Sequence, residues 1–218
     1  MVDVSRSPIS LEGLDLAALV ASRVCHDVIS PVGAIVNGLE LMEDGADAST
    51  TELALDLIRK SAKTASARLQ FCRIAFGAAG SAGSAIDTRD AQTVATNFLT
   101  DDRTSVDWHV PAAYLPKNRV KLLLNMLMLA AGGIPRGGVI KVEATGEGDE
   151  TGFTVTVTGL NARIPPHAVD LLAGIPANEQ GSIDAHAIQP YYTGVLARAA
   201  SMTISIEKVE DYVVIRAV

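Results

Sequence analysis

The chain is poor in cysteine and in aromatic residues. Of its 218 residues only two are cysteines, Cys25 and Cys72, and 4% are aromatic. Two cysteines are too few for a disulfide framework, and no second pair completes a zinc site, so we predict no bound metal. Because rings are scarce, small and aliphatic side chains must fill the core, which favours close contacts between alanine-rich helices.

An excess of basic residues is also missing. The chain has 18 Lys and Arg against 25 Asp and Glu, which gives a formal net charge of −7. Nucleic-acid binding calls for a concentrated basic face, which this balance does not favour. We therefore expect no nucleic-acid partner.

Long hydrophobic runs are absent as well. The longest apolar run, residues 122–134, is interrupted by Asn125 and two glycines, and it is shorter than the ~20 residues that a membrane span needs. Residues 1–10 carry Asp3 and Arg6 and no apolar signal region. We therefore predict a cytoplasmic protein that does not contact a membrane.

What the chain does have is two stretches with helical periodicity. Pro31 and Gly33 should bend the first helix, and Ser49 with Glu52 predicts a capping box that opens the second. A hairpin with two narrow apolar faces cannot bury both, so two copies should pair into a four-helix bundle. The predicted seam residues are Leu14, Ala17, Ala21, Val24, Val28, Ile35, Leu39 and Met42, then Ala54, Ile58, Ala62, Ala65, Leu69, Cys72 and Phe76.

His26 lies off the first stripe. It is two residues from both Val24 and Val28, so at about 100° per residue it is turned roughly 200° from the seam and faces water or a partner. Ser22 and Ser30 are its neighbours on the same face, and Arg23 and Asp27 are close by. An accessible imidazole beside a proton acceptor can act as a nucleophile in phosphoryl transfer.

The pattern changes beyond a small-residue linker at 78–87. Helices are predicted near 90–99, 117–131 and 185–200, and strands near 106–110, 139–144, 153–158, 202–207 and 212–217. This order predicts a two-layer α/β sandwich over 88–218, after a tail at 1–10 and a helical hairpin at 11–77. The fold class is therefore α+β.

Two motifs carry a family resemblance. The spacing His26-Asp27-x-x-x-Pro31 resembles the phosphoacceptor box of sensor histidine kinases. The stretch from Cys25 to Leu41 is similar to the signature of ChpT-type histidine phosphotransferases, and it is the specific part of the match. The resemblance implies a dimeric kinase-like hairpin joined to a degenerate ATPase-like domain.

The second domain departs from an ATP-binding kinase domain at the positions that hold nucleotide in that family. Asn125 is a lone polar residue in its helix, and Leu129 stands near where a second magnesium-binding asparagine would be expected. The loop Thr158-Gly159-Leu160-Asn161-Ala162 has no carboxylate and one glycine, and residues 171–195 hold only scattered glycines. We therefore predict that the chain binds no ATP and no other cofactor.

The resemblance also implies a mechanism. A receiver domain of a hybrid histidine kinase would phosphorylate His26, which would pass the group to downstream response regulators in a cell-cycle phosphorelay, and the receiver would hold Mg²⁺. Asp27 would orient the imidazole or take its proton, and Ser30 and Ser22 would leave room for phosphate. Receiver docking would use the residues Ser22, Arg23, Ile29 and Arg68.

Other interpretations stay open at this point. His26 could be an ordinary surface histidine, and His109, His167 and His186 have no comparable company. The chain could be an ATP-dependent histidine kinase, a non-catalytic dimeric adaptor that docks response regulators, or a receiver phosphatase in which Ser30 positions water. Asn125 could be a relic ligand or a hydrogen-bonded core amide, and Trp108 is expected in core or edge packing.

Overall fold

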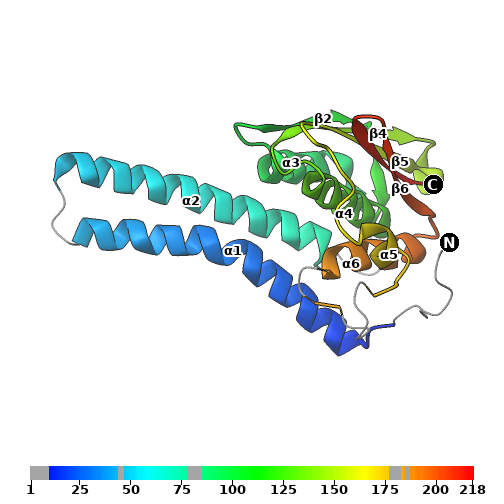
Figure 1. Ribbon diagram of the computed structural model, residues 1–218, viewed down its shortest axis with the longest axis horizontal. Coiled ribbons are helices and arrows are strands. Elements are labelled where there is room, and N and C mark those ends of the chain that lie inside the picture. The colour runs from blue at the N-terminus through cyan, green and yellow to red at the C-terminus, as the bar shows by residue number, and fades with distance from the viewer. Residues whose placement is uncertain (1–9, 44–46, 78–84, 177–182, 185–186) are drawn as a thin grey trace.

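The computed structural model describes residues 10–43, 47–77, 85–176, 183–184 and 187–218. A long helical hairpin projects from a mixed α/β unit, so the predicted α+β class is confirmed (Figure 1). The elements are α1 (Gly13–Glu43), α2 (Ala48–Ala75), β1 (Ala85–Asp87), α3 (Thr88–Leu99), β2 (Thr104–His109), β3 (Tyr114–Pro116), α4 (Lys117–Gly132), β4 (Gly138–Thr145), the 3₁₀ turn η1 (Gly148–Glu150), β5 (Gly152–Thr158), α5 (Ala168–Leu172), α6 (Ile188–Ala199), β6 (Ile204–Val209) and β7 (Tyr212–Ala217).

The second helix begins earlier than its predicted cap. Asp47 is the N-cap of α2, and its side chain accepts a hydrogen bond of 2.7 Å from the backbone N–H of Thr50. The bonds from Thr50 hold the pKa of the Asp47 carboxyl below its usual value. The predicted capping box of Ser49 and Glu52 is therefore wrong, because Ser49 already lies inside the first turn.

Helix α1 is continuous through Pro31 and changes direction along its length (Figure 1). The predicted interruption is thus a bend within one helix, as expected where a proline removes one backbone donor. In the C-terminal half of α1, a stripe at heptad spacing packs toward α2. This stripe consists of Val24, Val28, Pro31, Ile35, Gly38 and Met42, which are buried or half-buried.

Gly38 shows how closely the two helices of the hairpin approach. A Cβ atom built at Gly38 would lie 2.7 Å from the Cγ1 atom of Ile58 and 3.3 Å from the carbonyl oxygen of Ala54 on α2. Leu39 is 48% exposed, because its neighbour Gly38 is the residue that faces α2 at this turn. The predicted seam is wrong at Leu14, which is 86% exposed, and at Ala17 and Ala21, which are exposed too. A one-sided stripe cannot hold over the whole of α1, because α2 pairs with only its C-terminal half.

The N-terminal half of α1 packs instead on the sandwich domain. Its side chains join a small apolar cluster against α6, and the backbone N–H of Leu11 donates to the Tyr191 hydroxyl at 3.2 Å. The cluster consists of Leu11, Leu16, Leu19 and Val20 with Leu171, Ile183, Ile188, Tyr191, Ala187 and Val195. Helix α1 therefore belongs to both the hairpin and the sandwich.

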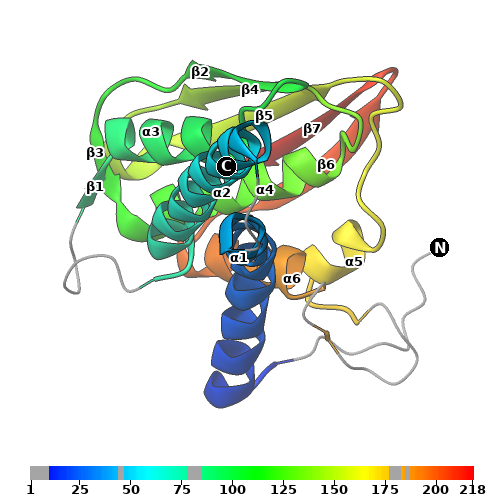
Figure 2. The ribbon, with the colours of Figure 1, turned by 90° about the vertical axis from the view of Figure 1, so that its left-hand side faces the viewer.

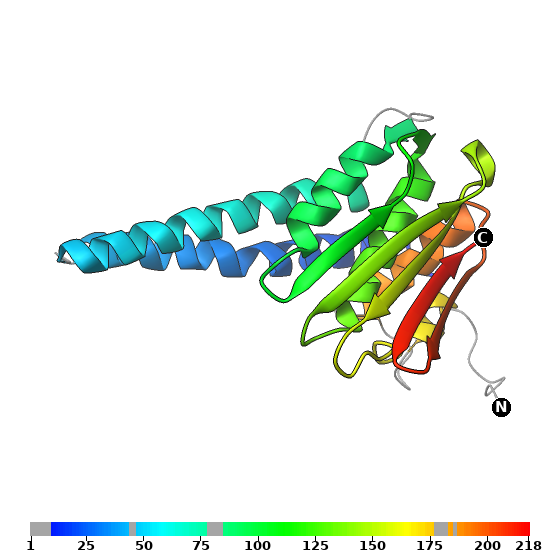
Figure 3. The ribbon, with the colours of Figure 1, turned by 90° about the horizontal axis from the view of Figure 1, so that it is seen from above.

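The sandwich is a five-stranded sheet of order β2-β4-β5-β7-β6, in which β2 and β4 run parallel and the other pairs antiparallel. Figure 2 shows α3, α4 and α6 on one side of this sheet, and Figure 3 shows its other face open. The inward side chains Ile140, Val142, Val155 and Val157 are completely buried. Lys141 pairs with Glu143 at 2.8 Å on the same strand.

Trp108 packs at the edge of this core, as predicted. Its ring is partly buried against the main cluster, and its Nε1–H donates to the Val110 carbonyl at 3.1 Å. Strands β1 and β3 and helix α5 were not predicted, because segments of three to five residues are too short to show a period.

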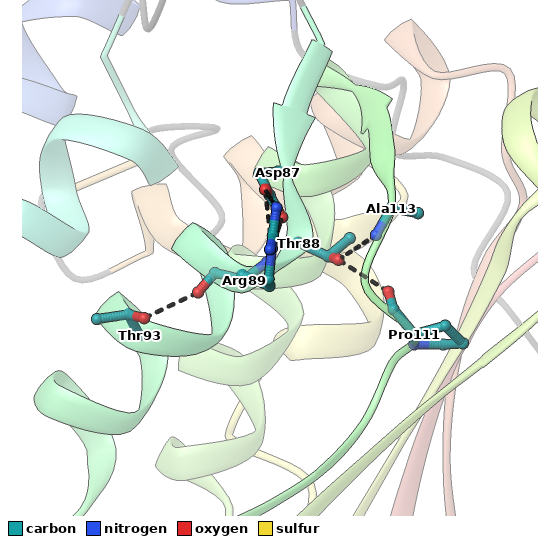
Figure 4. A network of polar contacts seen from close by, with 6 residues as sticks. All are labelled: Asp87, Thr88, Arg89, Thr93, Pro111 and Ala113. Atoms are coloured by element: carbon teal, nitrogen blue, oxygen red, sulfur yellow. Dashed lines mark hydrogen bonds and ion pairs between the residues drawn. The ribbon is translucent and has the colours of Figure 1, made fainter.

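Part of the predicted linker 78–87 is ordered into the fold. Ala85–Asp87 forms β1 and pairs with β3, which corrects the assignment of these three residues, whereas residues 78–84 lie outside the described part. The Asp87 carboxylate caps α3 by accepting from the Arg89 N–H at 2.9 Å. Figure 4 shows the Thr88 hydroxyl donating to the Pro111 carbonyl at 2.8 Å and accepting from the Ala113 N–H at 2.9 Å. The start of α3 is therefore fixed to the segment before β3.

Hairpin and sandwich are joined at Asn125 of α4. Its Nδ2 group donates to the Ala75 carbonyl of α2 at 3.1 Å and to the Lys121 carbonyl at 2.9 Å, and the residue is fully buried. The rings of Phe71 and Phe98 stack nearby with centroids 4.4 Å apart. The core-amide interpretation of Asn125 is therefore confirmed, and its amide ties the end of α2 to the sandwich.

Among the helices that the structure describes, one, α1, is long and apolar enough to cross a membrane by length and composition alone, with a mean hydropathy of 1.4 over its best window. The sequence expectation considered only the apolar run at 122–134. Length and composition do not separate a spanning helix from one that packs on protein. In this fold α1 packs on α2 and α6 and carries the ion pair of Arg23 with Asp27.

Candidate active site

His26 stands on the outer surface of α1, where its side chain is 65% exposed. Ser22 and Ser30, one turn away on either side, are exposed too, and so is Cys25. The small hydroxyl side chains leave open space around the imidazole. The site predicted from helical spacing is therefore accessible to another protein.

Asp27 is the acidic neighbour of the imidazole. Its side chain is only 14% exposed, and its Oδ1 atom lies 3.7 Å from the Nδ1 atom of His26. This separation is too long for a hydrogen bond but close enough for electrostatic attraction. The Oδ2 atom accepts a hydrogen bond of 3.0 Å from the Nε group of Arg23, so the carboxylate is held by one cation beside the ring.

Arg68 reaches the same place from α2. Its Nη1 group donates to the backbone carbonyl oxygen of Asp27. Arg23, Asp27 and Arg68 also line a cavity of about 340 Å³ that extends to Met128 and Gly132 at the end of α4. Of the predicted docking residues, Arg23 and Arg68 are thus half-buried and bonded within the chain, whereas Ser22 and Ile29 are exposed.

The sequence carried a signal for one of these two arginine contacts. Arg23 stands four residues before Asp27, which is the spacing of a helical ion pair. Arg68 is 41 residues from Asp27, and no local spacing indicates their contact. Of the other histidines, His109 pairs with Asp107 at 2.9 Å, His167 precedes α5 with a φ of 59°, and His186 lies outside the described residues.

Cys72 lies behind this site in the hairpin seam and is 4% exposed. Burial raises the pKa of its thiol to about 11; the charge of Asp27 adds to the rise, and Arg23 and Arg68 oppose it. A pKa two units above the ordinary value leaves about a hundredfold less thiolate at pH 8.

We expect Cys72 to resist thiol reagents in the native chain at pH 8 and to react promptly once the chain is unfolded. A Cys25→Ser variant leaves Cys72 as the sole cysteine, so absorbance of the released thiolate from a disulfide reagent measures Cys72 alone. The native rate should rise about tenfold per pH unit between 8 and 10. Labelling of the native variant as fast as the unfolded one would contradict this burial.

The sandwich positions that resemble a nucleotide site do not fit a magnesium–nucleotide complex. The Nδ2 group of Asn125 is committed to two carbonyls, and its Oδ1 atom, although without a partner, is enclosed in the core. Leu129, one turn later, is 3% exposed. A Cβ atom at Gly159 would lie 2.5 Å from the Gly137 carbonyl oxygen, so this glycine serves close packing of two strand ends.

No cluster of three His, Cys, Asp or Glu side chains suited to a metal ion occurs in the described ranges. A cavity of about 530 Å³ does lie beside the end of α4. Among the residues that line it are Arg23, Pro165, His167, Asp184 and Gln189.

Comparisons with known proteins agree with this architecture. A family model described as histidine phosphotransferase C-terminal domain matches residues 88–212. Protein phosphotransferase ChpT of Brucella abortus (strain 2308) is 51% identical over 210 residues, which cover 96% of this chain and 98% of that protein. A solved structure described as a 1.7 Å structure of a bacterial phosphotransferase is 49% identical with a TM-score of 0.88, and the match covers 97% of this chain and 99% of that one.

A histidine kinase, AdeS of Acinetobacter baumannii, also aligns over 88% of this chain and 95% of its own, at 10% identity and a TM-score of 0.46. Fold, exposed imidazole and relatives together define the chain as a phosphotransferase, not an ATP-dependent kinase. More particularly, the chain belongs to the histidine phosphotransferase family.

Proposed function

We propose that the chain relays a phosphoryl group from a receiver-domain phosphoaspartate through His26 to the aspartate of a response regulator. The observation that carries this proposal is the imidazole of His26, which is 65% exposed on a rigid helix beside the Asp27 carboxylate. A nitrogen nucleophile presented in this way needs only a phosphorylated partner in line with it.

The geometry supports a distinct role for each ring nitrogen. Nδ1 of His26 faces Asp27 at 3.7 Å, so Nε2 is the nitrogen turned toward a partner. In the first half-reaction Nε2 attacks phosphorus, a P–N bond forms, and the P–O bond to the partner's aspartate breaks with release of the carboxylate. Asp27 stabilises the proton on Nδ1 throughout. The second half-reaction reverses these steps with a second aspartate as the acceptor.

The neighbours of His26 fit the passage of a phosphoryl group. Ser22 and Ser30 are small and exposed, and each can donate a hydroxyl hydrogen bond to phosphate oxygen. Arg23 pairs with Oδ2 of Asp27 at 3.0 Å, which leaves Oδ1 as the carboxylate oxygen that faces the ring. Ile29, 70% exposed one turn further on, offers an apolar contact for a docking receiver.

We further propose that the relay uses no ATP and no resident metal. The fully buried Asn125, the apolar Leu129 and the tightly packed Gly159 support this, because none of them can contact a metal-bound triphosphate. Magnesium would then be held by the acidic cluster of the receiver that carries the aspartate. The partners are a hybrid kinase's receiver upstream and response regulators downstream, and the family resemblance suggests a cytoplasmic cell-cycle relay.

A homodimer completes this proposal, because the hairpin leaves a second apolar stripe uncovered. On α1 the stripe consists of Val32, Val36 and Leu39, each at least 44% exposed. At about 100° per residue it is turned some 100° from the stripe that packs on α2. On α2 the positions Leu55, Ala62 and Leu69 lie on the same side of the hairpin. In a four-helix bundle each helix packs against two neighbours, so it needs two apolar faces, one for the hairpin and one for the second copy.

Transfer from a radiolabelled receiver tests the relay directly. When the receiver's phosphoaspartate is mixed with this chain and Mg²⁺, we expect label to appear on the chain within minutes and to be lost in acid but kept in base, as a phosphoramidate is. Labelled ATP with the chain alone should give no product. Stable labelling from ATP, or no labelling from any receiver, would contradict the proposal.

A further inference from the structure

Pro31 leaves one backbone acceptor of α1 without its helical partner. In an α-helix the carbonyl of residue i accepts from the N–H of residue i+4. For Asp27 that residue is Pro31, which has no N–H and whose ring pushes against this same carbonyl. Pro31 is buried, so the gap faces the interior of the hairpin.

Arg68 fills this gap from the other helix. Its guanidinium donates to the carbonyl oxygen of Asp27, across 41 residues of sequence. A charged donor gives a stronger bond than a neutral amide, and an acceptor left unpaired in a half-buried place is costly. The bond therefore replaces a missing helical bond by one that also ties the bent turn of α1 to α2.

This turn carries the reactive residue. Asp27, whose carbonyl is bonded to Arg68, directly follows His26, and its carboxylate is held by Arg23 on the same helix. Main chain and side chain of Asp27 are thus fixed by two different arginines. Arg23, Asp27 and Arg68 all line the cavity of about 340 Å³, so removing the Arg68 side chain enlarges a space that is already open beside the Asp27 carbonyl.

We propose that Arg68 is a positioning residue for phosphotransfer: through the Asp27 carbonyl it holds the proline-bent turn that aims His26 at the partner. This assignment rests on the proposed function of His26. It differs from a docking role for Arg68, in which the guanidinium would contact the receiver itself.

The test measures single-turnover transfer from a labelled receiver to the full-length chain over a range of receiver concentrations. Arg68→Ala should lower the maximal rate about tenfold and leave the half-saturating concentration unchanged, because the site is misaligned but the docking surface is intact. Arg68→Lys, which keeps a charged donor, should retain most of the rate. Arg59→Ala on the exposed side of α2 is the matched control and should transfer like the wild type.

A second background makes the test specific. Pro31→Ala restores an N–H at residue 31 that can donate to the Asp27 carbonyl, so adding Arg68→Ala to this variant should cost less than about twofold. An equal loss in both backgrounds would overturn the assignment, and so would a rise in the half-saturating concentration alone. If the wild-type chain accepts phosphate and both Arg68→Ala and Arg68→Lys transfer at the wild-type rate, only the positioning role of Arg68 is overturned. A wild-type chain that accepts none overturns the proposed function and this assignment with it.

Discussion

Replacing His26 with alanine should reduce phosphoryl acceptance by at least about a thousandfold, because it removes the nitrogen that forms the P–N bond, and the neighbouring serine hydroxyls are much weaker nucleophiles at neutral pH. The fold should be unaffected. A side chain that is 65% exposed contributes little to the core, so the free energy of unfolding should change by no more than about 0.5 kcal/mol. Label transfer and thermal unfolding, measured on the same preparation, separate the two effects.

His109→Gln is the matched control for this variant. His109 is also an exposed histidine paired with an aspartate, but it lies on β2 of the sheet, and its loss should leave transfer at the wild-type rate. Binding of the receiver to His26→Ala should persist, because the docking surface is not altered. If His26→Ala still passed signal between two regulators, the adaptor function would replace the relay.

Replacing Val36 with aspartate should prevent the proposed homodimer from forming. Val36 lies in the middle of the uncovered stripe of α1, and ten residues separate it from His26. The substitution would bury a carboxylate from each copy in an apolar seam, which costs several kcal/mol and weakens association by at least about a thousandfold. Light scattering should give twice the chain mass of 22.8 kDa for the wild type and 22.8 kDa for the variant.

Leu53→Asp provides the comparison for this experiment. Leu53 is 70% exposed, but the helical spacing places it on the opposite side of α2 from Leu55, Ala62 and Leu69. The Leu53→Asp variant should therefore remain a dimer. A monomeric wild type, or a dimer that tolerates the charge at Val36, would show that this stripe is not a dimer interface.

The sequence predicted the helices and strands of this protein better than it predicted which side of each helix is buried. Long periodic stretches indicated both hairpin helices and all five strands of the main sheet, because 3.6-residue and two-residue periods are local properties. The predicted position of Leu14 was wrong for a different reason. A helix that changes partner along its length has no single stripe, and the change depends on α6, more than 150 residues away.

The predicted capping box was wrong by two residues, because the N-cap of α2 is Asp47 and not Ser49. Both Asp47 and Ser49 are residue types that cap helices, and the sequence alone does not decide between them. Asp47 caps because its backbone is extended, with a ψ of 170°, whereas Ser49 has already entered the helix. The three-residue strand β1 was assigned to a linker because its stability comes from pairing with β3, and no short-range pattern shows this.

By itself the sequence determined the reactive turn: on any helix, His26 beside Asp27 and five residues before Pro31 points away from the seam of Val24 and Val28, because the angle per residue is fixed by the backbone. Only the tertiary structure decided what holds that turn. Arg68 meets the Asp27 carbonyl and Asn125 meets the Ala75 carbonyl across 41 and 50 residues. Such contacts follow from how the helices pack, since they pair groups that local geometry leaves unsatisfied.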